Sequence, residues 1–200
     1  MASCQKKSGA PTPALFRQTV KYVQGKWAHR HIIDDLNPIT ESYFKFCFVR
    51  NPWDRCVSQY FFRRQRGYQG AYYGKKWKFK AYRGTTFREF IINKSDKFKV
   101  APTFKSPALN KAYTLNDPFV AQVEWISNES GEVLMDFVGR FESLQEDFNT
   151  VCDRVGIPHQ KLPHKNRTHH KGYAEYYDDE TRQIVAEKYA KDIEHFGYEF

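Results

Sequence analysis

The feature that most constrains the fold is a short apolar run that ends abruptly on an arginine. Residues 44–49 read FKFCFV, and Arg50, Asn51 and Pro52 follow directly. A short, nearly continuous apolar run is typical of a strand covered on both faces, as in a parallel sheet flanked by helices. Asn51 and Pro52 are favoured at the N-cap and the first position of a helix, so we expect a helix over residues 53–64. Its spacing predicts three inward residues: Val57, Tyr60 and Phe61.

A strand that leads straight into a helix N-terminus is a candidate anion site. The first N–H groups of a helix lack intrahelical acceptors, and the helix dipole is positive at that end. Arg50 can bind a phosphate through two parallel hydrogen bonds, and Ser58 lies about two turns into the helix. The same residues also allow a surface ion pair between Arg50 and Asp54, with Ser58 solvated. Both interpretations stay open at this point.

The distribution of charge indicates an anionic partner. The chain of 200 residues carries a formal charge of +9, and residues 61–115 contain fourteen basic side chains against Glu89 and Asp96 only. Aromatic residues interleave with these cations: Tyr68, Tyr72, Tyr73, Trp77, Phe79 and Tyr82. Such a segment suits stacking on sugars with recognition of their anionic groups, binding of single-stranded nucleic acid, or a solvated variable loop.

Periodicity assigns the remaining segments. Residues 87–91 (FREFI) indicate a short helix within a basic section that otherwise reads as loop, and residues 120–127 and 132–141 read as strands around the turn NESG. Residues 143–158 give the clearest helix, with Ser143 and Glu146 as a predicted capping box. A final helix is expected from about Asp178.

The sequence shows no sign of a transmembrane helix, a secretory signal or a zinc site. It contains no run of 18 apolar residues and no apolar leader at its N-terminus. Its four cysteines, Cys4, Cys47, Cys56 and Cys152, show no zinc-binding spacing. We interpret Cys47 and Cys152 as small buried hydrophobic residues, while a disulfide stays open.

Residues 44–62 resemble the 3′-phosphate-binding segment of the Golgi-type carbohydrate sulfotransferases and their bacterial and viral relatives. The pattern in that family is an apolar strand followed by Arg-(Asn/Asp)-Pro-x-x-Arg-x-x-Ser. Its elements are present here as Arg50, Asn51, Pro52, Arg55 and Ser58. Residues 122–148 and 176–200 resemble the later strand–helix unit of the family and its C-terminal helix, which ends in Phe-Gly-Tyr. The resemblance covers about residues 20–62 and 119–200.

The resemblance implies a fold, a reaction and a co-substrate. The fold would be α/β, a short parallel sheet flanked by helices, similar to the P-loop nucleotide kinases. The reaction would move a sulfuryl group from 3′-phosphoadenosine 5′-phosphosulfate (PAPS) to a hydroxyl, usually of a glycan, without a metal. Arg50 and Ser58, joined by Arg55, would hold the 3′-phosphate. Further cofactor contacts are implied for a segment that closes over the nucleotide: Asn166, Arg167 and Thr168.

The reaction also needs a base for the acceptor hydroxyl and cations for the developing charge. His29 and His31 lie about twenty residues before Arg50, where some family members carry a His-x-His pair and use a histidine as base. The resemblance does not choose between these two histidines. Asp34 and Asp35 are the alternative bases.

The N-terminus departs from the family pattern. The family opens with a buried strand and a Pro-Lys-Thr loop that holds the 5′-phosphosulfate, whereas this chain has only SCQKKSGAPTP. Lys6 and Lys7 are the candidates for the cofactor-binding lysine, but Pro11 removes an amide donor. We therefore expect a chain that is truncated at its N-terminus, with the 3′-phosphate half of the site intact.

The prediction is a single sulfotransferase domain over residues 1–200, with a basic, aromatic-rich excursion at about 63–115 that forms the acceptor surface. The expected partner is an anionic carbohydrate and not nucleic acid. Two rivals remain, a catalytically impaired binder of nucleotides or polyanions and a basic nucleic-acid-binding protein. A sulfotransferase of this sequence would be cytoplasmic if it is bacterial or viral, and in the Golgi lumen if it is a fragment of a eukaryotic enzyme. The sequence leaves the acceptor and the oligomeric state open.

Overall fold

The structure, a computed structural model, describes residues 36, 38, 40–66, 69–72, 75–78, 84–92, 103–106, 111–114, 120–163 and 170–200. Its strands are β1 (Phe46–Val49), β2 (Gln69–Tyr72), β3 (Lys75–Lys78), β4 (Thr103–Ser106), β5 (Lys111–Thr114) and β6 (Phe137–Arg140). Its α-helices are α2 (Pro52–Arg66), α3 (Phe87–Ile92), α5 (Gln122–Ile126), α6 (Leu144–Val155), α7 (Asp179–Lys188) and α8 (Ala190–Phe196). Short 3₁₀ turns cover Thr40–Ser42, Phe141–Ser143 and Tyr173–Tyr176.

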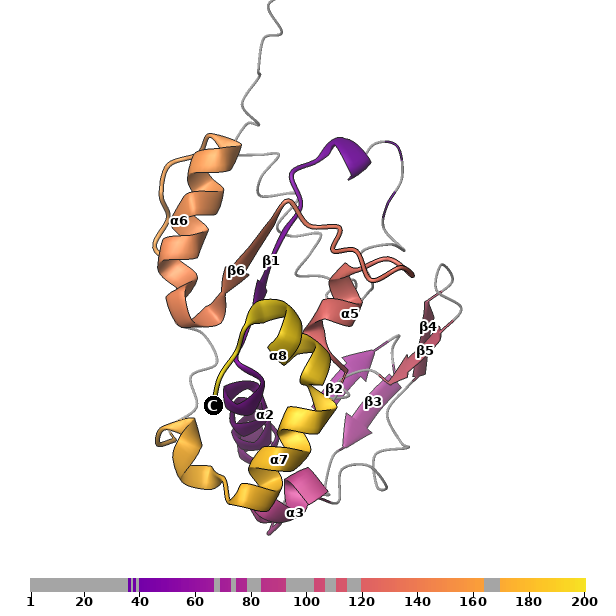
Figure 1. Ribbon diagram of the computed structural model, residues 1–200, viewed down its shortest axis with the longest axis vertical. Helices are drawn as coiled ribbons and strands as arrows, with labels where there is room; N and C mark the ends of the chain where they lie inside the picture. Colours follow the sequence, from indigo (N-terminus) through magenta and orange to yellow (C-terminus); the bar gives the residue numbers. More distant parts are fainter. Residues whose placement is uncertain are drawn as a thin grey trace, which may run out of the picture.

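A two-stranded parallel sheet forms the centre of the described part of the chain (Figure 1). Strand β1 pairs with β6 in parallel, with Phe46 opposite Phe137 and Val49 opposite Arg140. Both strands deliver their carboxyl ends to the same edge, where β1 continues into α2 and β6 into the turn before α6. The expected mixture of helices with a short parallel sheet is therefore present.

Helix α6 covers one face of this sheet. Phe148, Val151 and Cys152 of α6 pack against a set of aromatic and aliphatic side chains from the strands and the following turn: Phe44, Phe46, Phe48, Phe137, Ile157 and Leu162. Successive residues of a strand point to opposite faces, so Val49 and Val138 pack on the other side. The prediction of a strand with packing on both faces is confirmed for residues 46–49 of the 44–49 run.

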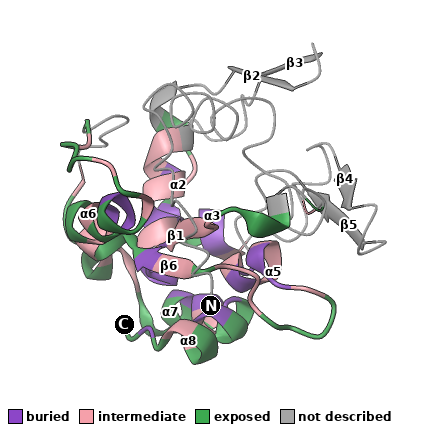
Figure 2. Cartoon of the chain, turned by 90° about the horizontal axis from the view of Figure 1, so that it is seen from above, coloured by how far each residue is buried: buried purple, intermediate pink, exposed green. Residues whose placement is uncertain are grey.

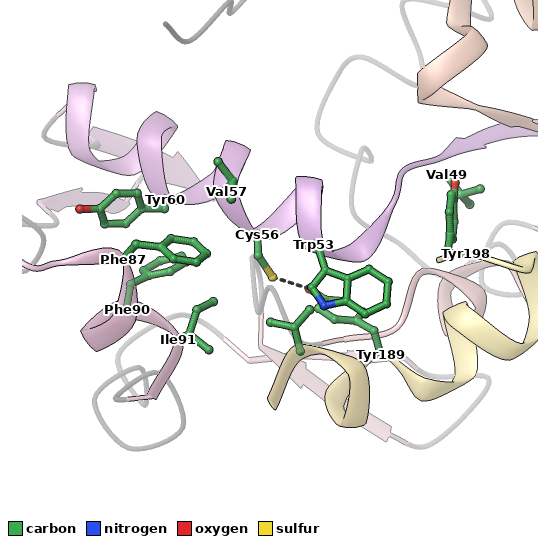
Figure 3. Packing of buried hydrophobic residues seen from close by; sticks show 11 residues of the cluster. Val49, Trp53, Cys56, Val57, Tyr60, Phe87, Phe90, Ile91, Tyr189 and Tyr198 are labelled. Atoms are coloured by element: carbon green, nitrogen blue, oxygen red, sulfur yellow. Dashed lines mark hydrogen bonds between the residues drawn. The ribbon is translucent and has the colours of Figure 1, made fainter. Parts of the chain in front are cut away.

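The larger core lies on that opposite side and is built mainly on α2 (Figure 3). Trp53, Cys56, Val57 and Tyr60 of α2 are buried together with residues of other elements: Phe87, Phe90, Ile91, Val185, Tyr189 and Tyr198. Figure 2 shows α6 with buried residues on one side and exposed residues on the other, whereas the residues of α5 are buried or partly buried. Helix α2 is thus anchored from Trp53 to Tyr60, and the residues at its start are held in fixed positions.

Helix α2 begins as the sequence predicted. The Asn51 side chain accepts the Trp53 N–H at 3.0 Å and the Asp54 N–H at 3.4 Å, which makes it the N-cap. Pro52, whose missing N–H costs nothing at the first helical position, is fully buried. The predicted inward residues Val57 and Tyr60 are buried, and Phe61 packs against the same cluster.

Two predictions about the middle of the chain are wrong. Residues 120–127 were expected to form a strand, but residues 122–126 form helix α5. The basic section was expected to be loop apart from 87–91, yet it contains two antiparallel hairpins, β2–β3 and β4–β5. Their strands mix polar, charged and aromatic residues, so an apolar pattern did not mark them.

The predicted capping box of α6 is also wrong, although the helix is present. The Ser143 side chain caps no amide of α6 and instead donates to Asp147 Oδ2 at 2.9 Å. A capping box does occur at α7, between Asp178 and Thr181. The final helix starts where expected but is divided at Tyr189 into α7 and α8.

Cys47 and Cys152 are free thiols, and the Cys56 thiol donates to the Tyr189 hydroxyl at 3.9 Å. Cys56 and Cys152 are fully buried, and Cys47 is partly buried. Burial raises the pKa of Cys47 to about 12. The interpretation of Cys152 as a small buried hydrophobic residue is confirmed, and Cys47 fits it in part. Helices long and apolar enough to cross a membrane are not found among the described residues.

Candidate phosphate-binding site

Arg50 lies where β1 ends and α2 begins, and its side chain is fixed by two contacts. Its Nε donates to Asp54 Oδ2 at 2.6 Å, and both side chains are about one-fifth exposed. Its guanidinium lies over the Phe141 ring, 4.2 Å from the ring centre. The ion pair with Asp54, one of the two interpretations of the sequence, is therefore present, but it is partly buried instead of lying freely on the surface.

These two contacts leave the outer edge of the guanidinium available. The hydrogen bond to Asp54 uses Nε, and within the described part of the chain no hydrogen bond of Nη1 or Nη2 is found. A guanidinium binds a phosphate best through two parallel N–H groups. Arg50 is thus held in one orientation while its two terminal nitrogens can still bind an anion.

The amides at the start of α2 do not contribute to the site in the way the sequence suggested. Asn51 accepts the N–H groups of Trp53 and Asp54, and the Asn51 N–H itself donates to Glu142 Oε1 at 2.6 Å. Since Pro52 has no N–H, the amides of residues 51–54 are all paired or absent. The expectation of unpaired amides is wrong, because side chains occupy them. An anion here would be held by side chains, with the helix dipole adding to the attraction.

The same corner is supported by the C-terminal residues 198–200. Asn51 Nδ2 donates to the Glu199 carbonyl at 2.8 Å, and the Tyr198 hydroxyl donates to Glu142 Oε2 at 3.5 Å. The Phe200 ring meets the Trp53 ring edge-on at 5.5 Å. Burial, followed by the nearby Glu142 carboxylate, raises the pKa of Tyr198, so its hydroxyl stays a donor. Sequence reasoning missed Phe141 and Glu142, since neither lies near Arg50 in the chain.

Ser58 shares a face of α2 with Asp54, and Arg50 precedes both at the same four-residue spacing. Its side chain is partly buried, and no hydrogen bond of its hydroxyl to another described residue is found. The Arg50–Asp54 contact shows that the Arg50 side chain runs along this same face. The structure therefore brings Arg50 and Ser58 to one side of α2, with Asp54 between them.

Arg55 points to another neighbourhood. Its Nη1 donates to the Val120 carbonyl at 3.1 Å and to the Tyr189 hydroxyl at 3.3 Å. Burial raises the pKa of Tyr189 well above its usual value, so this hydroxyl remains neutral. The contacts give Arg55 a structural role that ties α2 to the start of α5 and the junction of α7 and α8. Its predicted contact with the cofactor stays a prediction.

The remaining predicted site residues lie outside the described residues: Lys6, Lys7, His29, His31, Asp34, Asp35, Asn166, Arg167 and Thr168. The chain is described again from His170, whose ring stacks on Phe61 with 5.2 Å between ring centres and 18° between planes. Phe61 is one turn beyond Ser58 on α2. The chain thus returns to α2 beside the candidate site, two residues after Thr168.

Comparison with known proteins identifies the family of the chain. The sequence model of the sulfotransferase family matches residues 4–199, nearly the whole chain. The chain belongs to the sulfotransferase family. No solved structure gives a significant match.

Relatives within this family include carbohydrate sulfotransferases. Human carbohydrate sulfotransferase 9 is 30% identical over 160 residues, which are 76% of this chain and 33% of that protein. Mouse carbohydrate sulfotransferase 11 is 26% identical over 137 residues, 66% of this chain and 38% of that protein. An uncharacterized protein of Archaeoglobus fulgidus is 29% identical over 120 residues, 60% of this chain and 73% of that protein. The alignments thus span about a third of the two named carbohydrate sulfotransferases, and the family resemblance stated from residues 44–62 is confirmed.

In the described part of the chain no group of three or more His, Cys, Asp and Glu side chains is arranged to hold a metal ion.

Proposed function

We propose that this chain is a PAPS-dependent carbohydrate sulfotransferase and that Arg50 and Ser58 bind the 3′-phosphate of the donor. The observation that carries the proposal is the state of the Arg50 side chain. Asp54 and Phe141 fix the guanidinium, and both terminal nitrogens lack a partner among the described residues. A cation held this way loses little side-chain entropy when it binds an anion.

The surroundings of Arg50 favour a phosphate ester over a carboxylate. Two terminal guanidinium nitrogens can bind two oxygens of one phosphate, and a hydroxyl at Ser58 can donate to a third. A carboxylate has only two oxygens and would use the guanidinium alone. Asp54 reduces the local positive charge, so the site discriminates by hydrogen-bond geometry as well as by net charge.

The rest of the proposal extends the family pattern to residues outside the described part. PAPS supplies the activated sulfuryl group, and the chain binds it and orients the acceptor hydroxyl. His29 or His31 takes the proton of that hydroxyl, with Asp34 and Asp35 as alternatives. Lys6 or Lys7 binds near the 5′-phosphosulfate, and Asn166, Arg167 and Thr168 close over the nucleotide. The contact between His170 and Phe61 supports the last assignment, because it brings the chain back to α2 close to Ser58.

We assign the acceptor to the class of anionic glycans. The relatives named as carbohydrate sulfotransferases support a carbohydrate. The fourteen basic residues of segment 61–115 support a negatively charged one. This segment lies between α2, which carries Arg50 and Ser58, and α5, so it leaves and rejoins the core close to the proposed donor site.

Calorimetric titration with 3′-phosphoadenosine 5′-phosphate tests the donor site. We expect micromolar binding that Arg50→Ala weakens by about 10- to 100-fold, since charge-assisted hydrogen bonds contribute about 1.5–3 kcal/mol. Arg88→Ala is the matched control, because Arg88 is an exposed arginine paired with Asp178 and Glu180. Adenosine 5′-phosphate, which lacks the 3′-phosphate, should bind wild type and Arg50→Ala equally. Absence of binding to the wild type, or binding that Arg50→Ala leaves unchanged, contradicts the proposal.

Transfer of labelled sulfate to uronate-containing and neutral glycans then separates an enzyme from a non-catalytic binder. Both would bind the donor nucleotide, so this measurement is decisive for activity. We expect transfer to the uronate-containing glycans. Nucleotide binding without transfer to any glycan would leave only the binding half of the proposal. Salt-sensitive binding to random oligonucleotides, unaffected by Arg50→Ala, would indicate a nucleic-acid-binding protein instead.

A further inference from the structure

The backbone of Arg50, and not only its side chain, is held by a residue 72 positions away. Gln122 at the start of α5 uses both ends of its side-chain amide on Arg50: Oε1 accepts the Arg50 N–H at 3.0 Å, and Nε2 donates to the Arg50 carbonyl at 2.8 Å. The strand ladder between β1 and β6 ends at Val49. The side-chain amide of Gln122 therefore makes, at Arg50, the two backbone hydrogen bonds that a neighbouring strand would make, at the point where β1 ends and α2 begins.

This arrangement needs a side chain that accepts and donates at once. Among the side chains of similar size, only an amide offers a carbonyl oxygen and an N–H₂ group on one planar unit. A glutamate of the same length could accept from the Arg50 N–H, but its carboxylate would face the Arg50 carbonyl without a proton to donate. A methionine could do neither.

A buried carboxylate sets the orientation of the amide. Asp192 of α8 is fully buried, and its Oδ2 accepts from Gln122 N–H at 2.8 Å and from Gln122 Nε2 at 3.2 Å. Its Oδ1 accepts from the Val123 N–H at 2.9 Å. Because the carboxylate accepts hydrogen bonds only, it requires the N–H₂ end of the Gln122 amide on its side, which leaves the oxygen for the Arg50 N–H. Asp192 also caps the first amides of α5, which explains a helix where the sequence suggested a strand.

We propose that Gln122, oriented by Asp192, is a positioning residue for Arg50. The Gln122 amide fixes the backbone from which the Arg50 side chain departs, while Asp54 and Phe141 fix the guanidinium at its far end. Displacements of about 1 Å in a binding group can cost two orders of magnitude in function, so both ends matter. This inference rests on the proposed 3′-phosphate site and adds to it a residue outside the Arg-Asn-Pro segment.

The test compares Gln122→Met and Gln122→Glu with wild type in the full chain, by titration with 3′-phosphoadenosine 5′-phosphate. At pH 8 we expect both variants to bind about tenfold more weakly or worse. Gln145→Glu is the matched control. Gln145 also uses both ends of its amide on backbone groups, those of Leu162 and Gln160, but lies on α6 without contact to Arg50. It should lose stability without losing affinity.

The pH dependence separates positioning from a general structural loss. In the Gln122→Glu variant, protonation of the introduced carboxyl restores a donor for the Arg50 carbonyl, and the neighbouring Asp192 carboxylate favours that protonation. The affinity of Gln122→Glu relative to wild type should therefore improve as pH falls from 8 to 5.5, while the deficit of Gln122→Met stays constant. Ionisation of the 3′-phosphate itself, with its pKa near 6, affects every variant and cancels in the ratio.

The outcomes are distinguishable from failure of the proposed function. If wild type binds and Arg50→Ala does not, but both Gln122 variants bind within twofold of wild type, the positioning role is wrong and the phosphate site stands. A Gln122→Glu deficit that is constant with pH also overturns the positioning role. If wild type itself does not bind, the proposed function fails before any Gln122 variant is measured. Should Gln122→Met not fold, Gln122→Asn, which keeps both groups on a shorter stem, is expected to show the same loss of affinity.

Discussion

Gly139 of β6 lies opposite Phe48 of β1, and we expect that replacing it by a larger residue destabilises the chain. A Cβ at this position would lie 2.7 Å from two ring atoms of Phe48 and 3.0 Å from the Cβ of Asp147. The perturbation is therefore Gly139→Ala, which places one methyl group between the sheet and the first turns of α6.

The magnitude follows from what can move. Carbon atoms in contact prefer about 3.5–4.0 Å, so the new methyl overlaps the Phe48 ring by about 1 Å. The Phe48 ring is held edge-on against Phe46, with 6.0 Å between centres. Asp147 cannot retreat freely, because its carboxylate accepts the Arg140 N–H at 2.5 Å and the Ser143 hydroxyl at 2.9 Å. Overpacking of a constrained core costs about 1–3 kcal/mol, and we expect a loss within that range.

Urea denaturation measures this loss as a lower midpoint at an unchanged slope. Gly172→Ala is the control, because its nearest neighbour would be 3.9 Å away and its φ of −54° suits alanine. We expect Gly172→Ala to lower the free energy of unfolding by less than about 0.5 kcal/mol, or to raise it slightly. In a Phe48→Leu background, Gly139→Ala should cost less, since the smaller side chain makes room. The reasoning is refuted if Gly139→Ala is neutral, or if its cost is the same with and without the Phe48→Leu substitution.

Three further outcomes are expected. Iodoacetamide at pH 8.5 should label Cys47 at least about 100-fold more slowly in the folded chain than in urea, because burial raises its pKa to about 12 and only the thiolate reacts; rapid labelling would contradict this. Asp178→Ala should lower the urea midpoint of unfolding at pH 7, since Asp178 accepts the Thr181 N–H at 2.7 Å and caps α7. Hydrogen bonds from Thr181 lower the pKa of Asp178 in the folded chain. The stability that the Asp178 carboxylate adds is therefore present above its unfolded pKa of about 3.9 and is lost as pH falls through the folded pKa. The difference in unfolding free energy between Asp178→Ala and wild type, measured by urea titration, should close below about pH 4. Asp54→Asn keeps an acceptor for Arg50 Nε but removes a negative charge, so 3′-phosphoadenosine 5′-phosphate should bind a few-fold more tightly in calorimetry. Weaker binding would show that the charge itself is needed to orient Arg50.

The sequence predicted those parts of the fold whose signals are local. The apolar run 44–49, the N-cap Asn51 and the inward residues Val57 and Tyr60 followed from composition and spacing within twenty residues. Helix α6 followed from its apolar periodicity, and it ends at Gly156, which has a left-handed conformation. In each case the residues that decide the structure are neighbours in the chain.

The parts that failed are decided by distant residues. Helix α5 is short and carries β-branched residues typical of a strand, but Asp192 accepts its first two amides from 70 positions away. Ser143 and Glu146 have the spacing of a capping box, yet the Ser143 hydroxyl donates to the Asp147 carboxylate, which also accepts the Arg140 N–H. A single sequence does not show which of several polar partners is nearest in space.

The candidate site divides along the same line. Arg50 and Ser58 could be chosen from the sequence because they lie eight residues apart on one helix face, and Asp54 was recognised as the alternative partner of Arg50. Phe141, Glu142 and Gln122 could not be chosen, since the first two follow β6, the second strand of the parallel sheet, and Gln122 belongs to α5. One signal could have pointed to them, namely that parallel strands end at the same edge and bring the residues that follow them together.

The parallel pairing of β1 with β6 joins residues 91 positions apart, and much of what lies between them is the basic segment. The entropy of closing such a loop grows only with the logarithm of its length, so halving or doubling it changes the free energy of folding by about 0.6 kcal/mol. Sequence on either side of α3, between Arg66 and Gly84 and between Ile92 and Val120, can therefore change in length at low thermodynamic cost, whereas α3 itself carries the core residues Phe87, Phe90 and Ile91. A lineage could acquire a new acceptor by replacing these two stretches while α3, Arg50 and the elements that hold Arg50 stay as they are.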